Sequence, residues 1–225
     1  GLDTWLDAYL LRRTDRPVPL DEGVLELDGT YRYRDADGAE RTEQLLPPQW
    51  GAPRARTLLI PLVKKLVEAG QQVIVIRAIR GEARGAALYL AGSLGLPAAK
   101  DALDALPAGD PSISSAELRR CLQGGTAFHV SDLDRDERRV IEDAFRAPDS
   151  TIRVMVATTT LAQGVNMPAE TVVIPELRRP AGAGTFRPYR VAEYKNTAGR
   201  AGRLGLTERG RAVVLAYSRA DAIQV

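Results

Sequence analysis

Two arginines among small residues carry the strongest chemical signal in this sequence. Arg200 and Arg203 lie three residues apart in EYKNTAGRAGR, residues 193–203, and each follows a glycine. Positions i and i+3 are neighbours on one face of a helix, so we expect both guanidinium groups to point the same way. The planar fork of arginine suits phosphate oxygens. Gly199 and Gly202 disfavour a helix, and so indicate either a tightly packed helix end or close approach to a ligand.

Two other polar segments follow predicted strands. RAIRGEARG begins at Arg77 after one apolar run, and ATTTLAQGVNMPAE, residues 157–170, offers threonine hydroxyls after another. Ligands of open α/β sheets bind beyond the carboxyl ends of the strands, so we expect all three segments at that edge. An ordinary polar helix start and a Gly-Val-Asn turn without a ligand are the competing interpretations.

Missing residue types limit the chemistry that this chain can do alone. The sequence has no G-x-x-x-x-G-K-[ST] loop and no Asp-Glu pair at a strand end of the Walker B kind. Its one histidine, His129, leaves no credible Ser-His-Asp triad, and its one cysteine, Cys121, makes a metal site unexpected. These features disfavour a hydrolase that works by itself.

Composition and charge place the chain among ordinary globular proteins, with 44% hydrophobic and 27% charged residues. No apolar run approaches a membrane span and no signal peptide is recognised, so we expect no membrane partner and a cytoplasmic location. Net charge is only +2, but residues 178–211 hold nine Lys or Arg against two Glu. Such clustering is typical of phosphate binding, and a solvated arginine-rich face is the competing interpretation.

The apolar pattern predicts two parts. Residues 1–53 combine a helical pattern over 1–13, two Asp-Gly turns that predict a small antiparallel β meander, and the linker PPQWGAP. Over residues 54–225, apolar runs alternate with helical patterns, which predicts an α/β fold with a parallel sheet and helices on both faces. Asp134 and Glu137 have the spacing of a capping box. The expected strands cover 72–79, 126–130, 152–158, 171–175 and 212–217, and 180–186 is expected to be a mobile loop.

The order of these segments resembles the second RecA-like domain, or helicase C-terminal domain, of superfamily 2 DExH/DEAD-box-type helicases. The segments are VIVIRAIRGEARGAALYLA, GTAFHVSDLDRDERRVIEDAFR, IRVMVATTTLAQGVNMPAETVVI and AEYKNTAGRAGR. VATTTLAQGVNMPA resembles motif V and NTAGRAGR resembles motif VI. The likeness is closest to the branch with archaeal DNA-repair and exosome-associated RNA helicases, and it implies a RecA-like fold over most of residues 16–218.

The resemblance implies roles for the matched residues. Arg203 matches an arginine finger that acts on the γ-phosphate of ATP, and Arg200 matches its partner in the same site. The other positions on the nucleotide side are Gly164, Asn166 and Asn196. The positions on the nucleic-acid side are Thr159, Thr160, Arg77, Arg80, His129 and Ser131.

The resemblance also implies partners outside the matched segments. ATP with Mg²⁺ is expected on a first RecA-like domain of the same protein, because this sequence lacks the P-loop and the DExH box, and the chain alone is expected to be inactive. The expected nucleic acid is single-stranded DNA or RNA. Asn196 replaces the usual Gln, and Arg77-Ala78 replaces the usual motif IV Ser or Asn. These departures favour the alternative of a non-catalytic RecA-like nucleic-acid-binding or assembly module, whereas Arg200 and Arg203 favour a motor.

Overall fold

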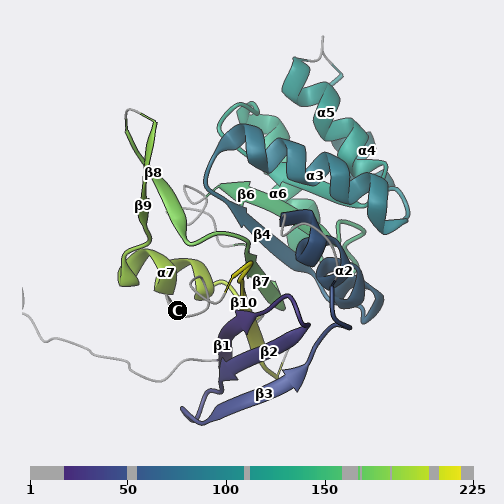
Figure 1. Cartoon of the computed structure of the whole chain (residues 1–225). Coiled ribbons are helices and arrows are strands. Elements are labelled where there is room, and N and C mark those ends of the chain that lie inside the picture. Colours follow the sequence, from purple (N-terminus) through teal and green to yellow (C-terminus); the bar gives the residue numbers. More distant parts are fainter. Residues whose placement is uncertain are drawn as a thin grey trace, which may run out of the picture.

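The computed structural model describes residues 18–49, 55–108, 112–158, 167, 169–182, 184–202 and 208–218. Within them, eight strands form one sheet in the order β3-β2-β1-β10-β7-β4-β6-β5, and β8 and β9 form a separate hairpin (Figure 1). The strands are β1 (Leu20–Leu25), β2 (Thr30–Arg34), β3 (Glu40–Gln44), β4 (Val73–Arg77), β5 (Thr126–His129), β6 (Val154–Thr158), β7 (Thr171–Ile174), β8 (Arg178–Gly182), β9 (Thr185–Pro188) and β10 (Gly210–Leu215).

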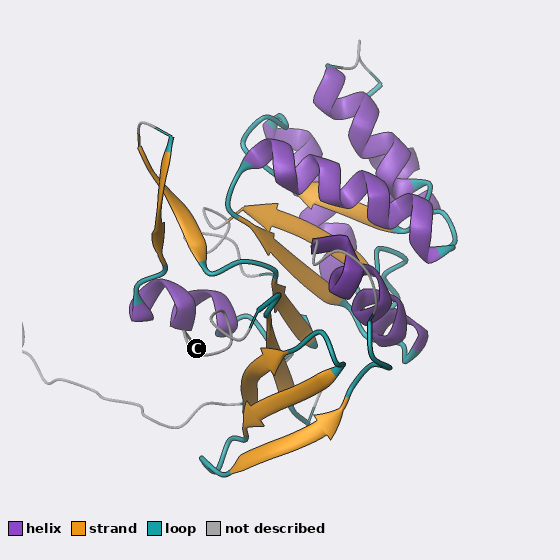
Figure 2. Cartoon of the chain, in the orientation of Figure 1, coloured by secondary structure: helices purple, strands orange, loops and turns teal. Residues whose placement is uncertain are grey.

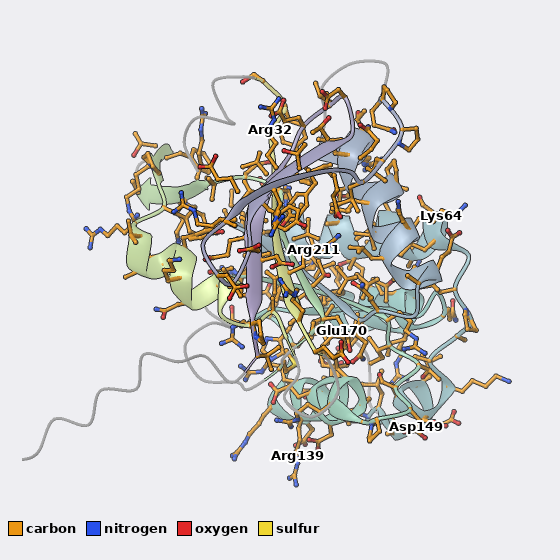
Figure 3. All side chains as sticks on the ribbon, turned by 90° about the horizontal axis from the view of Figure 1, so that it is seen from below. Arg32, Lys64, Arg139, Asp149, Glu170 and Arg211 are labelled. Atoms are coloured by element: carbon orange, nitrogen blue, oxygen red, sulfur yellow. The ribbon has the colours of Figure 1, made fainter. Side chains whose placement is uncertain are left out.

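Helices flank this sheet, as expected for the α/β class (Figure 2). The helices are α2 (Ala55–Glu68), α3 (Arg80–Leu94), α4 (Lys100–Ala105), α5 (Ile113–Leu122), α6 (Arg135–Arg146) and α7 (Val191–Ala198). Lys64 of α2 and Arg139 of α6 lie on different sides of the molecule (Figure 3). The sequence predicted the central strands well because β4, β6 and β7 are covered on both faces and are almost entirely buried.

The predicted antiparallel meander is present, and it extends the main sheet. β2 pairs antiparallel with both β1 and β3, while β1 pairs parallel with β10 along its whole length. Tyr31 anchors the meander, since its ring is fully buried and its hydroxyl donates to the carbonyl of Ala212 at 3.0 Å. The predicted helix at 1–13 lies outside the described residues, and the division at residue 53 stays a prediction.

The segment expected to be a loop at 180–186 contributes to a two-stranded hairpin, so that prediction is wrong. β8 and β9 pair antiparallel from Arg178↔Pro188 to Gly182↔Thr185, with an irregularity after Pro180. The hairpin projects from the body of the molecule beside α7 (Figure 1). Its small residues and prolines lack the alternation by which strands are recognised in a sequence.

Among the helices of the described residues, none is both long and apolar enough to cross a bilayer.

Candidate functional site

The chain that follows α7 makes a tight turn at the amino ends of β7 and β10. The N–H of Ala169 donates to the carbonyl of Arg200 at 3.1 Å, and the N–H of Gly202 donates to the carbonyl of Ala169 at 2.6 Å. Ala201 thereby forms a parallel bridge with Ala169, just before β7 begins. The backbone of Arg200 is therefore fixed against the start of a central strand.

Close packing accounts for the glycines in this turn. Gly202 has a φ of +93°, and a β-carbon there would lie 2.7 Å from Cγ1 of Val18. A β-carbon on Gly210 would lie 2.6 Å from the backbone of Ala201. One on Gly199 would lie 2.8 Å from the carbonyl oxygen of Lys195. Of the two interpretations left open by the sequence, the packed helix end is the one that these contacts support.

Two predictions about this segment are wrong. α7 ends at Ala198, before Arg200, and the backbone of Gly202 is left-handed, so the helix predicted to carry this segment stops before Arg200. The segment also lies at the amino ends of β7 and β10, not at the carboxyl edge. The reason is topological: β7 and β10 run parallel and are connected through the β8–β9 hairpin and α7, so the chain after α7 has already returned to the starting edge of the strands.

Arg200 and Asn196 are the two described residues of the predicted nucleotide side. The side chain of Arg200 is half-buried, and burial lowers the pKa of its guanidinium below the ordinary value. Asn196 is exposed near the end of α7. Arg203, Gly164 and Asn166 lie outside the described residues.

Arg77 lies at the carboxyl end of β4, and the protein encloses it. Its side chain is 10% exposed, and its Nη2 donates to Glu82 at 3.1 Å and lies 3.3 Å from a carboxylate oxygen of Glu176. Glu82 belongs to α3 and Glu176 follows β7. Arg77 therefore joins two elements at this edge, a role that the sequence did not suggest.

Arg80 and Ser131 form a surface group at the same edge. Nη1 of Arg80 donates to Oγ of Ser131 at 3.2 Å and to a carboxylate oxygen of Asp132. Arg84 pairs with Glu117 at 2.6 Å and lies 3.6 Å from Asp132. The predicted contact residues Arg80 and Ser131 are thus brought together, in a cluster that contains carboxylates as well as arginines.

His129 lies at the carboxyl end of β5 and is turned toward α6. Its side chain is 9% exposed, and its Nε2 lies 2.7 Å from Oε1 of Glu142. Burial lowers the pKa of His129, and the neighbouring Glu142 carboxylate opposes that shift. The imidazole is a paired interior group, unlike the neighbouring Ser131. Thr159 and Thr160 lie outside the described residues.

Glu193 is a residue that sequence reasoning missed. Its carboxylate pairs with Arg179 of β8 at 2.7 Å and with Arg187 of β9 at 2.6 Å, and it accepts the N–H of Arg190 at 2.8 Å. Glu193 thereby accepts the N-cap N–H of α7, but arginine at the N-cap has no acceptor for the reciprocal bond, so no capping-box signature marked Glu193 in the sequence.

The fold and this arrangement of segments define a class. A mostly parallel sheet flanked by helices carries motif-like segments at both edges, which is consistent with the RecA-like domain of a helicase. The model of the helicase conserved C-terminal domain matches residues 113–205. The chain therefore carries the helicase C-terminal domain of the superfamily 2 type.

Curated proteins that are similar to this chain indicate which branch of these helicases it resembles. The chain is 35% identical over 224 residues to the ATP-dependent DNA helicase Hel308 of Pyrobaculum calidifontis, which covers 97% of this chain and 30% of that protein. It is 34% identical over 229 residues to Hel308 of Caldivirga maquilingensis, covering 97% of this chain and 28% of that protein. Over 100 residues it is 47% identical to Hel308 of Aeropyrum pernix, covering 44% of this chain and 13% of that protein. The domain is thus close to the Hel308 branch, and it spans less than a third of these relatives' length.

Proposed function

We propose that this chain is the C-terminal motor domain of an ATP-dependent DNA helicase. The observation that carries the proposal is the anchored turn at Ala169, Arg200 and Gly202, which fixes the backbone of the motif VI segment at one edge of the sheet. A group that stabilises charge in a transition state must be held in place before the reaction. The names of the relatives, which are ATP-dependent DNA helicases, support ATP and DNA as the ligands.

The nucleotide would lie against the amino ends of β7 and β10. Arg200 fits this role because a half-buried guanidinium offers donors to phosphate oxygens in a partly dry setting. Arg203 would act as the arginine finger, with Gly164, Asn166 and Asn196 lining the same side. Mg²⁺ would be held with ATP on a first RecA-like domain of the same protein.

The single strand of nucleic acid would lie along the carboxyl edge. Arg80 and Ser131 present donors there, and phosphate contacts of this kind position a strand without reading its bases. Thr159 and Thr160 are proposed for the same surface. Arg77 and His129 are proposed at this edge too, and their burial favours a part in shaping it from within.

The first test uses ATP hydrolysis. The 225-residue chain alone should hydrolyse no ATP above background. In the protein that joins this chain to a P-loop domain, Arg203→Ala should lower DNA-stimulated ATP hydrolysis by about 10³–10⁵-fold and leave DNA binding nearly unchanged. Arg139→Ala is the matched control, because Arg139 is an arginine of α6 whose side chain is 81% exposed. Hydrolysis that survives Arg203→Ala would contradict the assignment.

The alternative function is a non-catalytic RecA-like module, which Asn196 favours through its shorter side chain. The same assay separates the two, because a module would bind DNA without hydrolysing ATP even when joined to its neighbouring domain. In a non-catalytic module, Asn196→Gln should change neither DNA binding nor the absence of ATP hydrolysis. In a motor, the same substitution should alter the Michaelis constant for ATP.

A further inference from the structure

The β8–β9 hairpin is joined to α7 by one carboxylate. Glu193 lies in the first turn of α7, and its two oxygens receive three bonds of 2.6–2.7 Å from the guanidinium groups of Arg179 and Arg187. Arg187 binds both oxygens, which is the strong two-pronged geometry of an arginine–carboxylate pair. All three side chains are between 22% and 34% exposed, so solvent screens this cluster only in part.

The two arginines need this carboxylate because they face each other. Arg179 and Arg187 are direct partners in the antiparallel register of the hairpin. Like charges directly opposite each other destabilise a strand pair. Glu193 offsets that repulsion, and in doing so ties both strands to the helix. The Arg190 N–H fixes the carboxylate from the helix side at 2.8 Å.

The other end of α7 carries the anchored turn. α7 has eight residues, so its axis is about 12 Å long. The hairpin is held at the first turn of α7 through Glu193, and Arg200, two residues after the last residue of α7, is held by Ala169. A short regular helix with both ends fastened moves as one piece.

We infer that Glu193 is a positioning residue that makes the β8–β9 hairpin and α7 one rigid unit, so that the hairpin follows any displacement of the Arg200 turn. The role of this rigid unit rests on the proposed function: in a motor, it would transmit a change at the nucleotide side to the hairpin. The rigid link itself is a property of this chain alone.

The test measures the link directly in the 225-residue chain. Spin labels at Phe186→Cys and Ala192→Cys, both exposed positions, report the distance between hairpin and helix. Cys121 does not interfere, because it is buried and its thiol has a pKa raised to about 12. We expect one narrow distance distribution in the otherwise unchanged chain. With Glu193→Gln we expect a broad one, and amide exchange in β8 and β9 faster by on the order of tenfold.

Two matched variants identify the cause. Glu117→Gln removes the charge that pairs with Arg84 at 2.6 Å, in side chains of similar exposure far along the chain from the hairpin, and should leave the distribution narrow. Arg187→Gln keeps the helix cap and the bond from Arg179, and removes two of the three bonds to Glu193, so it should broaden the distribution less than Glu193→Gln does. A distribution that stays narrow in Glu193→Gln, or broadens there but not in Arg187→Gln, would overturn the inference. If the ATPase assay contradicts the proposed function, the distance distributions are still expected as described. The proposed function and the rigid link through Glu193 can therefore be refuted separately.

Discussion

Gly202 has a backbone conformation and surroundings that exclude a larger residue. Its φ is +93°, a region that L-residues rarely adopt, and the Val18 side chain occupies the space of a β-carbon. The same turn carries Arg200, so Gly202 helps to fix the backbone from which the Arg200 side chain extends.

Gly202→Ala should therefore destabilise the fold by about 1–3 kcal/mol, measured by urea denaturation. Gly85→Ala is the matched control. Gly85 lies inside α3 with open space around its missing β-carbon, so alanine there should stabilise by roughly 0.5–1 kcal/mol. Val18→Ala should relieve only part of the Gly202→Ala loss, because the positive φ remains. Equal effects of alanine at both glycines would refute this explanation.

His129 gives the fold a pH dependence that can be isolated, since it is the one histidine of the chain. Burial holds the pKa of His129 below its ordinary value of 6.5. The unfolded chain therefore binds this proton more readily than the folded chain, and stability falls as the pH drops below about 6.5.

The comparison is between the wild type and His129→Gln, which keeps a polar side chain near Glu142 but does not titrate. Between about pH 7.5 and pH 5.5, the free energy of unfolding should decline more steeply in the wild type. Parallel curves for the two proteins would show that His129 gains its proton equally in both states.

At the scale of the element, the sequence correctly predicted the features that depend on nearby residues, namely the buried strands and the helix cap. The apolar runs at β4, β6 and β7 indicated buried parallel strands, and all three are present. Asp134 accepts the N–H of Glu137 at 2.7 Å, so the capping box that begins α6 is confirmed. These features depend on residues that are neighbours in the chain or on a strand's own composition.

The elements that the sequence missed depend on partners far away in the chain. The β8–β9 hairpin is fastened by Glu193, which follows it, and has no alternating pattern of its own. The turn at Arg200 is set by Ala169, a contact across 31 residues that no local spacing reveals. For the same reason the sequence did not indicate which edge of the sheet each segment of the candidate site lies on. That edge depends on how the chain connects the parallel strands, which is a property of the tertiary structure.

At the scale of the whole molecule, the meander of β1, β2 and β3 and the parallel strands from β10 to β5 belong to one hydrogen-bonded sheet. β1 lies between β2 and β10, and Tyr31 reaches from β2 to the Ala212 carbonyl. Its ring stacks on Tyr33 at 4.9 Å and lies 5.3 Å from the Arg211 guanidinium. We therefore expect residues 18–49 to unfold together with the rest of the sheet, although the sequence predicted a boundary at residue 53.

Tyr31→Phe tests this cooperativity because it removes only the hydroxyl that bonds to β10. Losing one buried hydrogen bond should lower the free energy of unfolding by about 0.5–1.5 kcal/mol. If the sheet unfolds as one unit, the slowest-exchanging amides of β7 and β4, which lie beyond β10 in the strand order, should lose the same protection as those of β1. Arg34→Ala is the control: Arg34 is exposed on the same strand, and its 3.7 Å pair with Glu40 should contribute little. Loss of protection confined to β1, β2 and β3 would show that the meander opens independently of the other strands of the sheet.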